Sequence, residues 1–348
     1  MSRRTPCRLA ALVGILVLSG CAAVQAAGRD VARTPAPLLG PAPPIRVGAD
    51  QVALLRSGIA TFARLRSLID ASRVSIHVEI YEFQRRDLAG ALVEAIRRGV
   101  AVTVIDDPSE LSSVASATML RAQGVDVVDY PIRSLMIDHV KLLVVDARVA
   151  VVGGINWGTS SPANHDYDAE LEGPVVANLD RIFLRDLVTC GRDVAVPDPV
   201  TDASILVAAT LPGAEIRPLA LGLIGAARRS LDLELFVLTD TGVVHALEAA
   251  AQRGVRVRIL LDPTQPSSDP AYNALLAAGI DVRWYRSSGE LLHAKAMVAD
   301  VSSVLFGSAN WSGGGFARNH ELDIEMPAAP AVAAAMLAQM NLDWVASG

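Results

Sequence analysis

Two short segments of the chain combine residue types that can exchange protons and hold an anion. The first places His139 two residues before Lys141, and the second places His293 two residues before Lys295. In a strand, residues two apart point to the same face, so each imidazole projects together with its ammonium. An imidazole exchanges protons or attacks near neutral pH, and an ammonium stabilises an anion. The two pairs therefore predict nucleophilic or acid–base chemistry on an anionic substrate.

Each pair is followed by the same additional residue types. An aspartate stands five positions after each lysine, at Asp146 and Asp300. This spacing places the carboxylate on the opposite strand face, so we predict that it anchors backbone at the strand end. A glycine-containing turn then leads to Asn156 or Asn310. Glycine permits a close backbone approach, and an asparagine amide can donate to an anion.

Both motifs belong to a duplication of the chain. Residues Ser75–Glu79 match Ser230–Glu234, and Asn164–His165 match Asn319–His320, both at an offset of 155. The histidine of the first motif matches that of the second at an offset of 154. Repeats should be sought before local motifs, and this one indicates two nearly gapless copies of one unit.

Helices and apolar strands are expected to alternate within each copy. The amphipathic segments that predict helices are residues 59–71, 88–98, 219–229 and 243–253. Alternation predicts the α/β class, with a layered unit and a largely parallel sheet in each copy. The expected domains are residues 45–190 and 203–348, joined by a connector at 191–202. They should face each other about a pseudo-twofold axis, as the subunits of a dimer do.

These paired motifs resemble the His-x-Lys-x₄-Asp signature of the phospholipase D superfamily, over essentially the whole mature length of the chain. The resemblance implies two α/β/α sandwich repeats with one shared active site. One histidine would attack phosphorus and form a phosphohistidine. The other would protonate the leaving alcohol and then activate water or an acceptor alcohol. Family analogy favours His139 as the nucleophile, and no metal ion or other cofactor is implied.

The resemblance also assigns the surrounding residues. Four side chains are expected to hold the phosphate oxygens: Lys141, Lys295, Asn156 and Asn310. An acid after each asparagine would orient a histidine, and the matching positions are Asp166 and Glu321. The first copy departs from the family pattern, because it has Asp166 where glutamate is commoner and Gly154 where the second has Ser308. These departures leave open whether the two halves are equivalent.

Two other duplicated pairs have alternative interpretations. Glu79 and Glu234 either line the site or are buried carboxylates paired with a lysine. His165 and His320 lie beside the orienting acids, and the duplication alone accounts for their recurrence.

The first residues read as a targeting segment. A basic start, an apolar stretch over residues 9–18 and Leu18–Cys21 resemble a bacterial lipoprotein signal at residues 1–20, with Cys21 lipidated. Ordinary secretion is the alternative. Residues 21–44 read as a proline-rich tether. The expected location is extracytoplasmic on a bacterial membrane. Ala22 carries no inner-membrane retention signal by the family rule, which favours an outer membrane if the source has one.

Charge and location together suggest the substrate. The net charge is −6, and a protein that neutralises many nucleic-acid phosphates usually shows the opposite balance. A lipoprotein meets phospholipid at high local concentration, so the expected partner is a phospholipid membrane and nucleic acid is disfavoured. Further membrane spans, usual in cardiolipin synthases, are not expected here. Hydrolysis or head-group transfer is therefore the preferred interpretation of the reaction. The alternatives are an extracytoplasmic nuclease and a catalytically idle, lipid-binding envelope lipoprotein. A monomer with an internal pseudo-dimer is expected.

Overall fold

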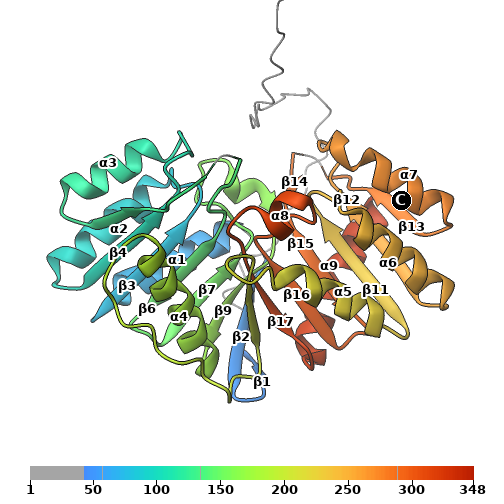
Figure 1. Cartoon of the computed structure of the whole chain (residues 1–348), viewed down its shortest axis with the longest axis horizontal. Coiled ribbons are helices and arrows are strands. Elements are labelled where there is room, and N and C mark those ends of the chain that lie inside the picture. Colours follow the sequence, from blue (N-terminus) through green and yellow to red (C-terminus); the bar gives the residue numbers. More distant parts are fainter. Residues whose placement is uncertain (1–42, 57, 134, 288) are drawn as a thin grey trace, which may run out of the picture. The chain divides into compact units, whose positions relative to one another are not determined.

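The computed structural model describes residues 43–348 except residues 57, 134 and 288. The expected signal segment, Cys21 and the tether up to residue 42 lie outside the described residues. The described chain forms two halves of similar construction, each a sheet with helices on both faces (Figure 1).

The elements of the first half follow the expected alternation. In chain order they are β1 (Ile45–Val47), β2 (Asp50–Leu55), α1 (Gly58–Ala71), β3 (Ser75–Ile80), α2 (Arg86–Arg97), β4 (Ala101–Asp106), α3 (Val114–Ala122), β5 (Asp126–Asp129), β6 (Lys141–Val145), β7 (Val149–Gly153), η1 (Ser161–Ala163), β8 (Asn164–His165), β9 (Asp168–Glu172) and α4 (Pro174–Thr189).

The second half repeats this order after a stretch without regular structure. Its elements are β10 (Leu206–Ala209), α5 (Ile216–Ala226), β11 (Ser230–Leu235), α6 (Thr241–Gln252), β12 (Arg256–Leu261), η2 (Pro266–Ser268), α7 (Asp269–Ala277), β13 (Asp281–Trp284), β14 (Leu291–Leu292), β15 (Lys295–Ala299), β16 (Ser303–Gly307), α8 (Gly313–Ala317), β17 (Leu322–Met326) and α9 (Pro330–Ala346).

The sheets are mixed, so the expectation of largely parallel sheets was wrong. The first sheet has the strand order β1-β2-β9-β7-β6-β3-β4-β5, and only the β3–β4 and β4–β5 pairings are parallel. Parallel neighbours need a crossover, which α2 and α3 provide. Strands β6 and β7 are instead joined by a tight turn in which Asp146 and Ala147 have φ values of 55° and 51°. The second sheet, β10-β17-β16-β15-β11-β12-β13, repeats this arrangement.

Helix α5 shows how the turn aspartates shape the ends of elements. It ends at Ala226, three residues before the predicted end, and the backbone N–H groups of Arg228 and Arg229 donate to the Asp300 carboxylate. That carboxylate satisfies amide groups that follow the helix. The chain then enters β11 at a fixed position.

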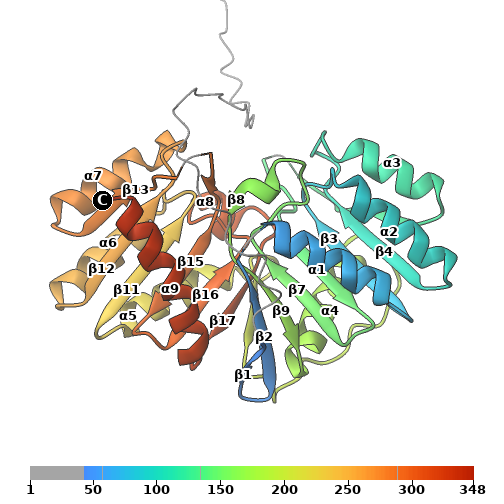
Figure 2. The same ribbon diagram turned by 180° about the vertical axis from the view of Figure 1, so that it is seen from behind.

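The hydrophobic core has three parts, one of which joins the halves. Two clusters lie within single halves, under α1 and α2 or under α5 and α6. The third cluster includes Val140 and Phe183 from the first half and Leu292 and Met336 from the second. Figure 2 shows α4 and α9, which carry part of this cluster. Among the described residues, no helix combines the length and the apolar character needed to cross a membrane.

Candidate active site

The two motif histidines lie where the halves meet. Each directly precedes the central strand pair of its sheet, and its backbone pairs with the opposite half. The N–H of His139 donates to the carbonyl of His320 at 2.7 Å, and the N–H of His293 donates to that of His165 at 2.9 Å. Both histidine side chains are buried. The position of each imidazole therefore depends on contacts between the halves.

The orienting acids act across the same junction. The Nδ1 atom of His139 lies 2.8 Å from Oε2 of Glu321, and Nδ1 of His293 lies 2.7 Å from Oδ2 of Asp166. A carboxylate at Nδ1 accepts a hydrogen bond from the Nδ1–H group, so the lone pair of a neutral imidazole lies on Nε2. Each half thus supplies a histidine to the other half's acid.

The two acids are supported differently. The Ser308 hydroxyl and the Asn319 amide donate to Glu321 at 2.7 Å and 3.0 Å. In the first half Gly154 takes the place of Ser308, and a Cβ atom there would lie 2.1 Å from Oδ1 of Asp166. The glycine and the shorter acid therefore fit together, because a serine would collide with Asp166 in its observed position.

The lysines lie beside their own histidines. The Lys141 ammonium donates to the backbone carbonyl of His139 at 2.6 Å, and Lys295 makes the same contact with His293. The Nζ atom of Lys295 also lies 3.1 Å from Nε2 of His293. Both ammonium groups are almost completely buried. Each ammonium group is consequently held beside the histidine of its own motif, and Lys295 lies 3.0 Å from Nδ1 of His293 as well.

The electrostatics indicate one cationic cluster made by both halves. Burial lowers the pKa of His139 well below its usual value, and the charges of Lys141 and Lys295 lower it further. Burial and Lys295 lower the pKa of His293 to about 4, with Lys141 acting in the same direction. Burial also lowers the pKa of Lys141 to about 7 and that of Lys295 to about 8. Such a buried cluster is stabilised by an anion, as expected of a phosphate site.

The asparagines follow tightly packed turns. The Oδ1 atoms of Asn156 and Asn310 are buried and have no hydrogen-bond partner within the described residues. At Gly307, which precedes the second asparagine, an added Cβ would lie 2.2 Å from Oδ1 of Asp323. The same carboxylate accepts from the Ala309 N–H at 3.0 Å, which fixes the turn. The close approach explains the glycine in this motif.

Several neighbours of the site were missed at the sequence level. Tyr81 lies edge-on to His139 with ring centroids 5.0 Å apart, and Phe236 lies 4.9 Å from His293. Their ring faces also lie near the two lysines, with Nζ to centroid distances of 5.2 Å and 5.1 Å. Asp323 and its counterpart Asp168 are buried as well. All four recur at the repeat offset of 155, which is the signal that could have identified them.

Asp146 and Asp300 lie at the far end of the strands. The Asp146 carboxylate accepts from the N–H groups of residues 73–75, at 2.7 Å from Val74 in the shortest bond. Asp300 makes equivalent bonds to residues 228–230. Both therefore hold the start of a neighbouring strand and lie apart from the histidine pair.

The remaining duplicated residues form separate buried contacts. Glu79 and Glu234 are both buried. The sequence suggested a lysine as the partner of each, but Glu79 pairs with His320 and Glu234 pairs with His165. In each pair the histidine comes from the other half. Neither histidine ring contacts the orienting acid that follows it in sequence, as far as the described contacts extend.

Comparisons with known proteins agree with this geometry. A family model described as cardiolipin synthase, phospholipase D-like domain, matches residues 65–187 and again residues 221–344. The chain therefore belongs to the phospholipase D-like family, with two copies of its domain.

Individual relatives are similar over most of this chain. It is 26% identical over 319 residues to "Probable cardiolipin synthase YwiE" of Bacillus subtilis, and 28% identical over 310 residues to cardiolipin synthase A of Pseudomonas putida. These alignments cover 81% and 79% of this chain but only 63% and 64% of the relatives.

A solved structure supports the fold. The phosphatidylserine synthase of Haemophilus influenzae matches with a TM-score of 0.66 at 11% identity, over 86% of this chain and 87% of that one. The α/β architecture with two phospholipase D-like repeats is thereby confirmed.

Proposed function

We propose that this chain is a phospholipase D-type enzyme that transfers or hydrolyses the phosphatidyl group of a phospholipid at the junction of its halves. The observation that carries the proposal is the cross-paired arrangement of His139 with Glu321 and His293 with Asp166. It supplies two oriented imidazoles beside two buried ammonium groups. The named relatives, which are cardiolipin synthases, favour phosphatidyl transfer as the reaction class.

In the first step, the Nε2 lone pair of His139 attacks phosphorus while its Nδ1–H stays bonded to Glu321. The bond from phosphorus to the head-group oxygen breaks. The His293 pKa is about 4 in the ligand-free protein, and the bound phosphate anion raises it, so His293 enters this step as the imidazolium. It gives its Nε2 proton to that oxygen, and the head group leaves as an alcohol. Lys141 and Lys295 stabilise the negative charge on the oxygens of the five-coordinate phosphorus. The product is a phosphatidyl group on His139.

In the second step, His293 is neutral and accepts the proton of an incoming alcohol or water. The new oxygen attacks phosphorus, the phosphorus–nitrogen bond breaks, and its electrons return to His139. An alcohol acceptor gives a new phospholipid, and water gives phosphatidic acid. The enzyme leaves the cycle in its starting protonation state.

Exposed apolar side chains in the segments that lead to the first histidine and follow a neighbour of Tyr81 favour a lipid over a nucleic acid. Leu111 and Leu135 are 81% and 80% exposed. Leu135 lies four residues before His139, and Leu111 follows Glu110, whose charge acts on Tyr81 beside the same histidine. Large apolar groups exposed at a site suit contact with acyl chains. The net charge of −6 opposes extended nucleic-acid binding.

The test uses vesicles of phosphatidylglycerol or phosphatidylethanolamine, with and without an alcohol acceptor, and supercoiled plasmid in parallel. We expect head-group release from vesicles, a transferred lipid when the alcohol is present, and intact plasmid. Plasmid cleavage without lipid turnover would support the nuclease alternative. Inactivity on both, with retained vesicle binding, would support the idle lipid-binding alternative.

A second assay examines the apolar contact separately. Replacing Leu111 and Leu135 by aspartate should lower turnover of vesicles several-fold and leave turnover of a short-chain soluble lipid unchanged, because only the bilayer contact is lost. Equal loss on both substrates would contradict this role.

We also propose that the chain is anchored outside the cytoplasm by lipid on Cys21, on the basis of the segment Leu18–Cys21. Labelling of cells with a radioactive fatty acid should mark the protein, and Cys21→Ser should abolish the label. Release of an unlabelled but processed protein from wild-type cells would support ordinary secretion.

A further inference from the structure

Two equivalent clusters of acids and histidines are buried between the halves, apart from the reacting histidines. One contains Glu79, Asp186 and His320, and the other contains Glu234, Asp343 and His165. In each, the histidine comes from one half and both acids come from the other. The rings of His320 and His165 stack on Tyr130 and Tyr285, respectively. The duplication thus provides the same residue types, a glutamate, an aspartate and a histidine stacked on a tyrosine, in both clusters.

The cluster around Glu234 gives each of its carboxylates at least one protein donor. Oε2 of Glu234 lies 2.8 Å from Nε2 of His165 and also accepts the Tyr167 hydroxyl at 2.8 Å. The Asp343 carboxylate accepts from the Gln339 amide at 2.9 Å. Protein hydrogen bonds therefore replace part of the hydration that these acids lose on burial, and Oε1 of Glu234 has no partner among the described residues.

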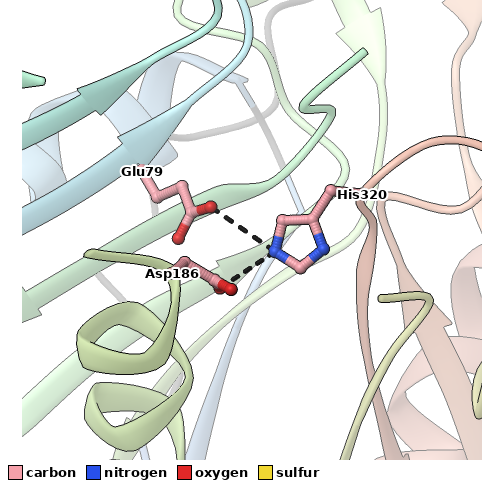
Figure 3. A group of neighbouring side chains, drawn as sticks. All are labelled: Glu79, Asp186 and His320. Carbon is pink, nitrogen blue, oxygen red and sulfur yellow. Dashed lines mark hydrogen bonds and ion pairs between the residues drawn. The ribbon is translucent and has the colours of Figure 1, made fainter. Parts of the chain in front are cut away.

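In the other cluster Asp186 accepts from the Arg185 guanidinium at 3.2 Å, but Glu79 lacks such support. Glu79 is fully buried, and neither of its carboxylate oxygens has a hydrogen-bond partner among the described residues. Figure 3 shows this carboxylate directed at the His320 ring, with Oε1 3.5 Å from Nε2. The same Nε2 atom lies 2.9 Å from Oδ2 of Asp186. One nitrogen thus faces two acids, and one of these acids has no hydrogen bond.

Two substitutions between the copies create the difference. Leu322 stands at the position of Tyr167, so the hydroxyl donor to the glutamate is missing. Asp138 stands at the position of Leu292 and adds a third buried carboxylate, whose Oδ2 has no partner among the described atoms. Burying an unpaired carboxylate is costly, so either a proton or a cation is needed there.

We propose that Glu79, Asp186 and His320 bind one divalent transition-metal ion, of which Zn²⁺ fits the donors best. One imidazole nitrogen and two carboxylates are ordinary zinc ligands, with bonds of about 2.0–2.2 Å. The three ligand atoms lie within 4.8 Å of one another. The 3.5 Å between His320 and Glu79 is close to the separation of two ligands on one tetrahedral ion. Asp186 would move slightly away from His320 to admit the ion.

The ion would fix the chain behind the reacting histidine. The carbonyl of His320 accepts from the N–H of His139, and Glu321, which follows His320, contacts the His139 ring. Tying His320 to β3 and α4 of the first half would hold that loop in place. This role is structural, and the ion takes no part in the bond changes proposed above.

The metal content of the purified protein tests the proposal. Full-length protein produced in zinc-supplemented medium should contain close to one zinc per chain, as measured by inductively coupled plasma mass spectrometry. Glu79→Gln should lose the metal, whereas the matched Glu234→Gln should keep it. Wild-type protein refolded with a chelator should melt several degrees lower than protein refolded with Zn²⁺.

A spectroscopic measurement covers the case in which Glu79→Gln fails to fold. Wild-type protein refolded with Co²⁺ should show a visible absorption band of tetrahedral or five-coordinate Co²⁺, and His320→Asn should lack it. Folded wild-type protein without bound metal under all these conditions would overturn the proposal. Equal metal loss in Glu79→Gln and Glu234→Gln would also overturn it, because the equivalent clusters would then not differ.

Discussion

In the second half Ser308 and Asn319 both donate to Glu321, whereas in the first half Gly154 leaves room for the shorter Asp166. Both acids still reach a histidine nitrogen at nearly the same distance. Both halves therefore keep the hydrogen bond between the acid and the imidazole, but they differ in the residues that hold the acid. Residues 154 and 166 therefore fit each other as a pair, and so do residues 308 and 321.

Removing either histidine tests whether the halves work together, and it should have the largest effect. His139→Asn and His293→Asn should each lower kcat at least about 10³-fold, because the nucleophile and the proton-transfer group act in one reaction. Steady-state turnover of vesicles measures the loss. His245→Asn, on the exposed face of α6, is the control. Two independent sites would instead leave about half of the activity in each variant.

Substitutions at the residues that hold the two acids should have a smaller effect on kcat. Gly154→Ser should displace Asp166 from His293 and lower kcat by about 10²-fold, since a shift near 1 Å is enough for such a loss. Ser308→Gly removes one hydrogen bond to Glu321 and should cost about 10-fold.

The double variant Gly154→Ser with Asp166→Glu copies the second half and should regain most of the activity. Steady-state kinetics of Gly154→Ser, Asp166→Glu and the double variant form a double-mutant cycle. Additive losses would show that residues 154 and 166 are not coupled.

The pH dependence should reflect the lysines of both halves. Because the pKa of Lys141 is about 7 and that of Lys295 about 8, kcat/KM should fall as the pH rises through 7 to 8 and the ammonium charges are lost. The lowered pKa of His139 keeps the nucleophile neutral well below the usual histidine value, so the acid limb should lie at low pH. His293 must be protonated in the first step, so its pKa of about 4 in the ligand-free protein adds to the decline of kcat/KM as the pH rises.

The arginine variants Lys141→Arg and Lys295→Arg, which stay charged, should move the alkaline limb to higher pH even if the rate is lower. An alkaline limb that stays in place would contradict the assignment.

The turn aspartates should behave alike in both halves and affect activity least. Asp146→Ala and Asp300→Ala each remove the acceptor of three backbone N–H groups, and each should lower the free energy of unfolding by about 1–2 kcal/mol. Urea denaturation measures this change, with kcat within about twofold of wild type. A large loss of kcat at unchanged stability would place these residues in the chemistry.

Spacing alone predicted the repeat, the alternation of elements and the grouping of His139 with Lys141. It could not predict that each histidine meets the acid of the other half, because that contact depends on how the halves pack. The mixed sheet was also missed, since the tight turn at Asp146–Ala147 contains no glycine or asparagine to mark a hairpin. Tyr81 and Phe236 were overlooked because an aromatic residue after a strand usually indicates core packing.

The count of phosphorylated histidines tests the shared site most directly. After brief exposure to phospholipid and rapid quenching under alkaline conditions, mass spectrometry of the intact chain should show one phosphatidyl adduct per chain, located on His139. The His293→Asn variant should form this adduct slowly and on His139 alone, because both steps use His293, and His139→Asn should form none. Two adducts on one chain, or adducts on both histidines in separate variants, would contradict a single site shared by the halves.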